Sequence, residues 1–226
     1  MRNYTLLYGL IFFVFYCSSG EHHHGNEAEH HMHSKTVDEL SKVFDDPERE
    51  TWQKPKEVIS LIYKNSKVKN PSDLRVADLG AGSGYFTMRF LDENSKVIAL
   101  DINEKFLEVI KKKSETHPQK KNLELRKTEP NSVNLKKKEV DVIITVNVYH
   151  HIENRIEYLK DLKNGLKDNG TFYLIDFKDG DLPVGPPQKI KLQTKTIEEE
   201  LIKAGFKVQI DSQLLPYQNI FISSNK

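Results

Sequence analysis

From Leu74 onward, short apolar runs alternate with charged stretches of helical period, and this alternation constrains the fold more than any other feature. The apolar runs, each expected to form a strand, cover residues 74–79, 96–101, 122–127, 140–147, 170–177, 206–211 and 217–223. Expected helices lie between most of them, at residues 84–92, 103–115, 153–167 and 195–204. This order predicts an α/β domain with a largely parallel sheet. Only the short stretch "SQLLP" separates the last two runs, so we expect them to pair antiparallel as a hairpin.

A glycine-rich turn, "VADLGAGSGYFT" at residues 76–87, joins the first expected strand to the first expected helix, where a nucleotide-binding turn belongs. Its glycines permit a tight backbone turn and the close approach of a ligand. Asp78, just before them, is near enough to orient a cationic group. Asp101 ends the second expected strand, where a carboxylate accepts hydrogen bonds from ribose hydroxyls. The pattern therefore predicts a ligand with a ribose and a positively charged amine, bound beyond the carboxyl ends of the strands.

The same turn argues against a dinucleotide. Tyr85 stands where the dinucleotide fingerprint requires a glycine. A nicotinamide-dependent dehydrogenase is thus a rival interpretation that the turn disfavours.

Several segments together resemble the class I S-adenosylmethionine-dependent methyltransferases over roughly residues 40–226. The glycine turn and "VIALDIN" resemble the first two cofactor motifs, "DVIITVNVYHHI" the fourth strand, and "LKNGLKDNGTFYLIDF" the following helix and strand. "LIKAGFKV" and "LLPYQNIFI" resemble the closing hairpin, and "DPERETWQKP" with "YHHI" resembles a bacterial subgroup of small methyltransferase-domain proteins. The resemblance implies a doubly wound, mostly parallel seven-stranded Rossmann-like sheet and S-adenosyl-L-methionine as cofactor.

The resemblance also assigns roles to individual residues. The glycine turn would hold the methionine part of the cofactor, Asp78 its amine, Asp101 its ribose, and Ile102 would flank the adenine. Glu129 would replace an acidic residue that contacts the adenine amine in many relatives, and Asn147 would approach the cofactor. The complete predicted cofactor set is Asp78, Gly80, Ala81, Gly82, Gly84, Tyr85, Asp101, Ile102, Glu129 and Asn147.

Methyl transfer to an acceptor that carries a proton is assisted by a base, and histidine titrates in the useful range. His150 and His151 follow the fourth expected strand, and we expect only one of these adjacent residues to face the ligand. The alternative is that they hydrogen-bond their own loop. Tyr149 and Tyr217 are further candidates for the acceptor site, with aromatic packing as the alternative for Tyr217.

Composition and one loop sequence narrow the range of possible methyl acceptors. Cys17 is the only cysteine, which excludes an internal disulfide and the covalent cysteine adduct of pyrimidine C5 methylation. The net charge of +1, from 34 basic and 33 acidic residues, gives no sign of nucleic-acid binding. The loop "NVYH" differs from the Asn-Pro-Pro-Tyr type of amino methyltransferases. A small molecule or a protein side chain remains, and the alternative is a catalytically silent methyltransferase fold that binds metal.

The first residues predict export. Arg2 and an apolar run from Leu6 to Tyr16 are typical of a secretory signal, since the run is shorter than the roughly 20 residues of a membrane span. Cys17 resembles the lipid-acceptor cysteine of a bacterial lipoprotein, so we expect an exported, membrane-tethered protein. Cleavage by an ordinary signal peptidase after residue 19 or 20, a buried N-terminal helix and a cytoplasmic location are the alternatives.

Between this signal (residues 1–20) and the methyltransferase domain (36–226) lies a histidine-rich linker, residues 21–35. Neutral imidazoles suit zinc, copper or nickel, so the linker is interpreted either as a metal-binding tether or as a plain disordered linker. The candidate metal ligands are His22, His23, His24, His30, His31 and His33.

A helical lead-in at residues 36–66 opens the domain. Thr36 and Glu39 match a capping box, and Pro47 and Pro55 stand where first-turn prolines belong, which predicts two restarts of the helix. Trp52, the only tryptophan, lies at the second restart and is interpreted either as a core residue or as part of a flap over the glycine turn.

Overall fold

The computed structural model describes residues 35–225, and within that range it contains a seven-stranded sheet of order β3-β2-β1-β4-β5-β7-β6. The strands are β1 (Arg75–Leu79), β2 (Lys96–Asp101), β3 (Leu123–Lys127), β4 (Val140–Val146), β5 (Leu166–Phe177), β6 (Phe206–Asp211) and β7 (Gln218–Asn225). β1 to β5 run parallel, and β7 pairs antiparallel with both β5 and β6. The predicted α/β fold and the predicted closing hairpin are confirmed.

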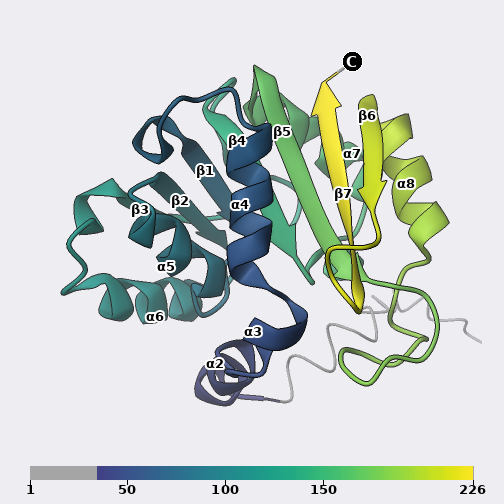
Figure 1. Cartoon of the computed structure of the whole chain (residues 1–226), viewed down its shortest axis with the longest axis horizontal. Coiled ribbons are helices and arrows are strands. Elements are labelled where there is room, and N and C mark those ends of the chain that lie inside the picture. Colours follow the sequence, from purple (N-terminus) through teal and green to yellow (C-terminus); the bar gives the residue numbers. More distant parts are fainter. Residues whose placement is uncertain (1–34, 226) are drawn as a thin grey trace, which may run out of the picture.

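Helices cover both faces of the sheet (Figure 1). One face carries α4 (Pro55–Asn65), α5 (Tyr85–Asp92) and α6 (Glu104–Ser114), and the other carries α7 (Arg155–Gly165) and α8 (Thr194–Lys203). Three 3₁₀ turns stand between these elements in the described range, η1 (Pro71–Asp73), η2 (Lys120–Asn122) and η3 (Tyr149–His151). The sheet is thus doubly wound, as the resemblance implied.

The largest difference from the predicted boundaries is at the start of β5. β5 begins at Leu166, directly after α7, although the sequence pattern placed its start at residue 170. The early part of β5 pairs with β4 only through Leu166 and Val140, and the register shifts before the regular pairing begins at Thr171. After Leu166 the first residues of β5 are polar, and their pairing is irregular, so this part of the strand has no apolar alternation and the sequence pattern missed it.

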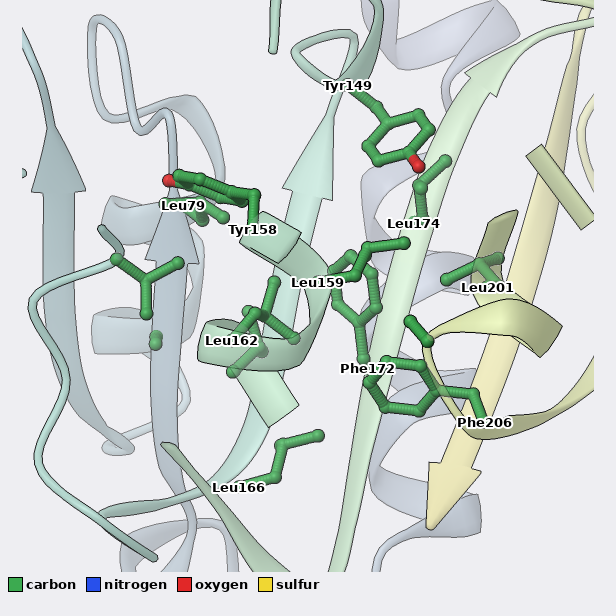
Figure 2. Close-up of a cluster of buried hydrophobic side chains, with 14 of the residues drawn as sticks. Leu79, Tyr149, Tyr158, Leu159, Leu162, Leu166, Phe172, Leu174, Leu201 and Phe206 are labelled. Atoms are coloured by element: carbon green, nitrogen blue, oxygen red, sulfur yellow. The ribbon is translucent and has the colours of Figure 1, made fainter. Parts of the chain in front are cut away.

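Apolar side chains fill the space on both faces of the sheet. Val76 packs toward α4 and α5, whereas its neighbour Ala77 packs toward α7 and α8, as the two-residue period of a strand requires. Figure 2 shows the second of these cores, where Leu159 and Leu162 of α7 and Leu201 of α8 meet Phe172 and Leu174 of β5. A central strand that is buried on both faces reads as an uninterrupted apolar run, which is why β1 and β4 were readily predicted.

The lead-in forms α2 (Val37–Phe44) and α3 (Arg49–Trp52) before α4. The Thr36 capping box with Glu39 is present, and α4 begins with Pro55, so these two signals are confirmed. The prediction for Pro47 was wrong, because α3 begins at Arg49 with Glu48 as its cap, and Pro47 therefore precedes the helix. Figure 1 shows α2 and α3 at the lower edge of the sheet, where the parallel strands end. The lead-in therefore lies at the edge where the glycine turn was expected to bind its ligand.

The predicted signal, Cys17 and the histidine-rich linker up to His33 lie outside the described residues. Among residues 35–225, none of the helices is long and apolar enough to cross a membrane. The same range contains no group of three or more histidine, cysteine or acidic side chains that would hold a metal ion.

Candidate active site

The glycine turn connects β1 to α5 in a conformation that favours glycine. Gly80, Gly82 and Gly84 have φ values of +71°, +51° and +84°. The N–H groups of Gly80 and Ala81 both donate to the Leu100 carbonyl of β2, at 2.8 and 3.0 Å. A Cβ at Gly80 would stand 2.4 Å from Cγ2 of Val148, so this position excludes a side chain on steric as well as conformational grounds.

Asp101, at the end of β2, is buried and faces the turn. Its Oδ2 accepts a hydrogen bond from the Gly82 N–H and its Oδ1 one from the Asn103 N–H, both at 2.8 Å. Burial raises the pKa of Asp101, and these backbone donors partly counter that effect. A carboxylate offers about four acceptor positions, so the backbone donors leave some of its acceptor capacity for a ligand hydroxyl. The remaining acceptor capacity suits the hydroxyls of a ribose.

Asp78, near the end of β1, is a second buried carboxylate. Oγ1 of Thr87 donates to its Oδ2 at 2.6 Å. Burial raises the pKa of Asp78 to about 6, although the hydrogen bond from Thr87 and the positive charge of Arg49 act in the opposite direction. Among residues 35–225, Asp78 forms no ion pair with a lysine, arginine or histidine. A buried acid without a paired cation suits a positively charged amine on a ligand.

The lead-in lies directly against the turn. Asp45, which follows α2, accepts hydrogen bonds from Oγ of Ser83 at 2.8 Å and from Nζ of Lys113 at 2.5 Å. The Phe44 ring lies so close that a Cβ at Gly82 would stand 3.1 Å from its Cδ2. These contacts join the segment before α3 to the loop that would hold the cofactor.

Tyr85 follows the turn and lies between two guanidinium groups. The guanidinium carbon of Arg49 is 3.8 Å from the centre of the Tyr85 ring and that of Arg89 is 3.7 Å from it. Burial lowers the pKa of Arg49 to about 10, which still leaves it charged at neutral pH. Arg49 was not among the predicted site residues, because an arginine in a charged lead-in looks like any solvated residue.

Trp52 is half-buried and packs on Phe177 at the end of β5, with ring centres 6.1 Å apart. The aromatic side chain of the lead-in that lies against the glycine turn is instead Phe44 of α2. Of the two interpretations of Trp52, packing between the lead-in and the sheet is the one that this geometry favours.

The predicted adenine contacts differ in exposure. Ile102 is 52% exposed, unusual for an isoleucine and suited to covering an aromatic ring. Glu129 is exposed, and its backbone forms a short bridge with Ser132. Its neighbour Thr128 is buried and donates its N–H to the Asp101 carbonyl at 3.0 Å. Thr128 is thus a candidate that the sequence analysis missed, and the role of Glu129 stays a prediction.

Beyond β4, a buried histidine of η3 pairs with a buried aspartate of β5. Nδ1 of His150 lies 3.1 Å from Oδ2 of Asp176 near the end of β5, and the two side chains are only 5% and 3% exposed. Oδ1 of Asp176 accepts the Phe177 N–H at 2.8 Å. Because a carboxylate only accepts, this contact favours the proton of His150 on Nδ1 and its lone pair on Nε2. Asp176 was missed, although an acid closing the apolar run "TFYLIDF" is the sequence signal for it.

His151 and Tyr149 differ from His150. The ring of His151 lies 4.2 Å from that of His150, and burial, reinforced by His150, lowers the pKa of His151 to about 4. His151 is therefore neutral at pH 7 and a weaker base than a free histidine. The hydroxyl of Tyr149 donates to Oε2 of Glu200 on α8 at 2.7 Å, and its ring lies in the core near Leu174 (Figure 2). This position explains Tyr149 structurally and leaves its catalytic role a prediction.

A hollow of about 330 Å³ lies at the opposite edge of the sheet, beside the starts of β4 and β5. It is lined by residues such as Asp141, Lys167 and Tyr173 and contains none of the predicted site residues. Ligands of parallel sheets bind beyond the carboxyl ends of the strands, so we place the site at the glycine turn and not in this hollow.

Comparison with known proteins bears on the family and the fold. Residues 77–172 match a family described as a methyltransferase domain. A curated relative, the ubiquinone/menaquinone biosynthesis C-methyltransferase UbiE of Wigglesworthia glossinidia brevipalpis, is 27% identical over 120 residues, which are 52% of this chain and 47% of that enzyme. The chain therefore matches less than half of that relative's length.

Solved structures are similar over more of the chain. A SAM-dependent methyltransferase from Aquifex aeolicus has a TM-score of 0.73 and 24% identity, with 84% of this chain and 98% of that one covered. The methyltransferase CalH, solved with S-adenosylhomocysteine (SAH), has a TM-score of 0.56 and 21% identity, with 70% and 52% covered. At these identities the likeness concerns the fold.

Proposed function

Because this chain is a class I, Rossmann-like methyltransferase whose cofactor is S-adenosyl-L-methionine, we propose that it methylates a small molecule whose acceptor atom gives up a proton. The observation that carries the proposal is the buried pair of His150 and Asp176, beyond β4 and close to the glycine turn. A small acceptor is favoured over a protein side chain because α2 and α3 cover this edge of the sheet.

The cofactor, when bound, supplies an electrophilic methyl group on a sulfonium, and the residues of the chain fit such a group. Asp78 would accept hydrogen bonds from the amine of the methionine part, and Asp101 would accept them from the ribose hydroxyls. The left-handed glycines let the backbone approach the ligand closely. Alignment of the partners and exclusion of water then account for much of the acceleration.

His150 would take the proton of the acceptor. Asp176 orients its imidazole through Nδ1 and stabilises the cation that forms when the other nitrogen accepts a proton. Both side chains are buried within the described part of the chain, so water is largely excluded from the pair that would take the proton.

Calorimetry with SAH and with NAD tests the cofactor first, and we expect only SAH to bind. A screen of small phenols, thiols, amines and carboxylates with methyl-labelled cofactor then identifies an acceptor. His150→Ala should slow its methylation by about 10²–10⁴-fold, the usual effect of losing a positioned base, with the affinity for SAH unchanged.

His117→Ala is the matched control. His117 also contacts an aspartate, at 3.0 Å, but this partner is the exposed Asp92 at the end of α5. We expect this control to leave the rate unchanged. If His150→Ala is as active as His117→Ala and His151→Ala is the damaging change, the base is His151. A protein that binds SAH but methylates no member of the screen would support the catalytically silent alternative.

We further propose that the protein is exported and tethered through a lipid on Cys17. Arg2 before the apolar run and the acidic, histidine-rich stretch after it support translocation of the rest of the chain. Cell fractionation after labelling with palmitate should find labelled protein in the membrane fraction, and Cys17→Ser should abolish the label. Full-length, unlabelled protein in the cytosol would overturn the proposal.

The histidine-rich linker is proposed as a metal-binding tether. Deletion of residues 21–33 should abolish retention of zinc or nickel while the affinity for SAH stays the same. Equal metal retention before and after the deletion would contradict this role and leave a plain linker.

A further inference from the structure

A chain of side-chain amides links the lead-in to the end of β4. Nε of Arg49 donates to Oε1 of Gln53 at 2.7 Å. Nε2 of Gln53 donates to Oε1 of Gln218, the first residue of β7, at 3.0 Å. Nε2 of Gln218 donates to Oδ1 of Asn147 at 2.6 Å. Both glutamines are 0% exposed, so buried polar groups from three separate segments have been brought together here.

The donor-to-acceptor direction of this series of hydrogen bonds is fixed at its Arg49 end. An arginine can only donate, so the side-chain oxygen of Gln53 must face Arg49 and its NH₂ group must face Gln218. The same logic turns the NH₂ group of Gln218 toward Asn147. The side-chain oxygen of Asn147 is thereby occupied, and its NH₂ group is what Asn147 presents to its surroundings. Within the described part of the chain, that NH₂ group has no hydrogen-bond partner.

Asn147 stands at the place where the acceptor is expected. It follows β4 with a left-handed φ of +59°, and its N–H donates to the Ile175 carbonyl of β5 at 2.9 Å. The next residue, Val148, packs against Gly80 of the cofactor turn, and His150 lies only three positions further along. Asn147 thus belongs to the same short segment as the residue that contacts the turn and the proposed base.

We propose that Asn147 donates a hydrogen bond to an acceptor oxygen that becomes anionic, so that the substrate is a phenol or an enol and not an amine. Gln53 and Gln218 are positioning residues that hold the Asn147 amide in its donor orientation. This inference rests on the proposed methyltransferase function. When the hydroxyl proton passes to the imidazole of His150, the electron pair stays on the oxygen, and the NH₂ group stabilises the resulting charge.

The electrostatics of the chain point in the same direction. Each amide carbonyl is turned toward the positive charge of Arg49 and each NH₂ group away from it, so the dipoles add along the chain. The positive end of the summed dipole is at the Asn147 NH₂ group. An amine acceptor would instead need a hydrogen-bond acceptor at this position, and the Asn147 oxygen is turned toward Gln218. Sites built to pair one polar group discriminate strongly against an analogue that lacks it.

Matched aromatic pairs test the substrate class: 1-naphthol against 1-naphthylamine, and catechol against 1,2-phenylenediamine. With the full chain saturated with SAH, calorimetry should show tighter binding of the hydroxyl members, and with methyl-labelled cofactor only these should be methylated. Tighter binding of the amines, or binding of neither series, would overturn the inference. A chain that fails to bind SAH would instead refute the proposed function itself.

Variants separate positioning from folding. Asn147→Asp removes the donor, so KM for the hydroxyl acceptor should rise about tenfold or more, and by more than KM for the matched amine. Gln218→Glu offers a second acceptor oxygen to the Asn147 NH₂ group and should turn that amide around, shifting the preference toward the amine. Gln218→Met, which has no polar group, should abolish the preference without reversing it.

Asn219→Asp provides the matched control, because Asn219 is the neighbouring buried amide and donates to Oγ1 of Thr194, outside the chain. Thermal melting of each variant verifies that it folds. If Asn219→Asp changes the ratio of hydroxyl to amine binding as much as Gln218→Glu does, the orientation argument fails.

Discussion

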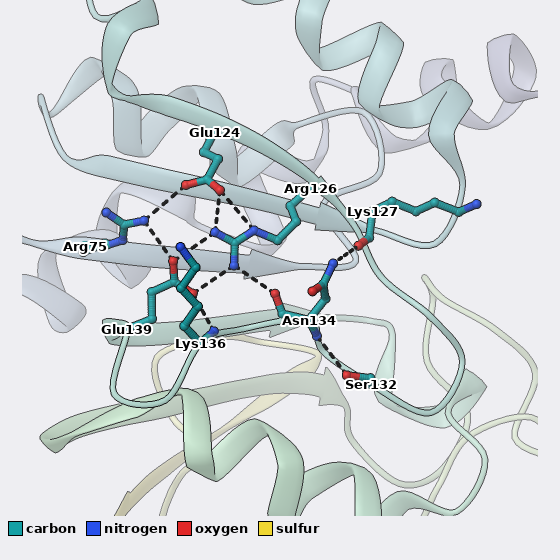
Figure 3. Close-up of polar contacts among 8 residues, drawn as sticks. All are labelled: Arg75, Glu124, Arg126, Lys127, Ser132, Asn134, Lys136 and Glu139. Carbon is teal, nitrogen blue, oxygen red and sulfur yellow. Dashed lines mark hydrogen bonds and ion pairs between the residues drawn. The ribbon is translucent and has the colours of Figure 1, made fainter.

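The two edges of the sheet use charged residues in opposite ways. At the amino edge, Arg126 bonds Glu139 through both Nη atoms at 2.9 Å, and Arg75 joins the same carboxylate at 3.1 Å (Figure 3). At the carboxyl edge, Asp78 and Asp101 are buried without an ion-pair partner among residues 35–225. One edge satisfies its charges internally, and the other keeps buried acids for a ligand.

The pKa values follow this difference. Hydrogen bonds from Arg126 lower the pKa of Glu139 to about 2, whereas burial raises the pKa of Asp78 to about 6. Folding therefore favours the charged form of Glu139 and the neutral form of Asp78. The difference indicates that the amino edge contributes to stability and that the carboxyl edge sacrifices some stability for binding, as functional sites commonly do.

The largest effect is expected at Asp101. Asp101→Ala removes the proposed ribose contacts, and loss of a hydrogen bond to a charged group costs about 1.5–3 kcal/mol, so the affinity for S-adenosylmethionine should fall by tenfold or more. Calorimetry measures this affinity. An unchanged affinity would show that the carboxyl edge does not bind the ribose through this acid.

Acid should weaken cofactor binding through Asp78. The amine of the cofactor needs the ionised carboxylate, so as pH falls below about 6 the affinity of the free protein for SAH should decline by up to about tenfold per pH unit. Titrations at a series of pH values test this. Asp78→Asn should bind weakly at every pH, and a wild-type affinity that is flat between pH 7 and 5 would contradict the assignment.

Asp78→Asn should also stabilise the unliganded fold at pH 7. The pKa of Asp78 is raised in the folded chain, so its contribution to stability is best at low pH and declines as pH rises through about 6. Removing the buried charge should therefore raise the free energy of unfolding by ~1 kcal/mol, measured by urea denaturation. A variant less stable than the wild type at pH 7 would contradict the claim that the carboxyl edge gives up stability for binding.

The opposite result is expected at the amino edge. Glu139→Gln should lower the free energy of unfolding by about 1 kcal/mol at pH 7 and leave SAH affinity unchanged. Because the pKa of Glu139 is lowered in the folded chain, this difference should shrink as pH falls below the ordinary glutamate value of 4.5 and vanish near pH 2.

Glu124→Gln is the control for this edge and the smallest expected effect. Glu124 contacts the same arginines, but its side chain is 46% exposed against 8% for Glu139. Solvent weakens such pairs, so the loss should be only about 0.3 kcal/mol. An equal loss from both variants would show that burial is not what makes the Glu139 contacts stabilising.

The sequence alone determined the fold class, the glycine turn and the two acids that flank it. Alternating apolar runs, capping residues and a turn between strand and helix are local signals, and each is legible within a dozen residues. The start of β5 was the exception, because Leu166 belongs to a strand through an irregular pairing and not through its own pattern.

Only the tertiary structure decided which polar residues meet at the site. Asp176 reaches His150 from a different strand, and Gln53 reaches Asn147 through Gln218, 165 residues further along the chain. Neither contact has a signal in the local sequence, since an aspartate or a glutamine is the same letter whether its side chain is solvated or buried. The physical reason is that parallel strands bring their carboxyl ends to one edge, and the partners found there depend on strand order, which no local pattern encodes.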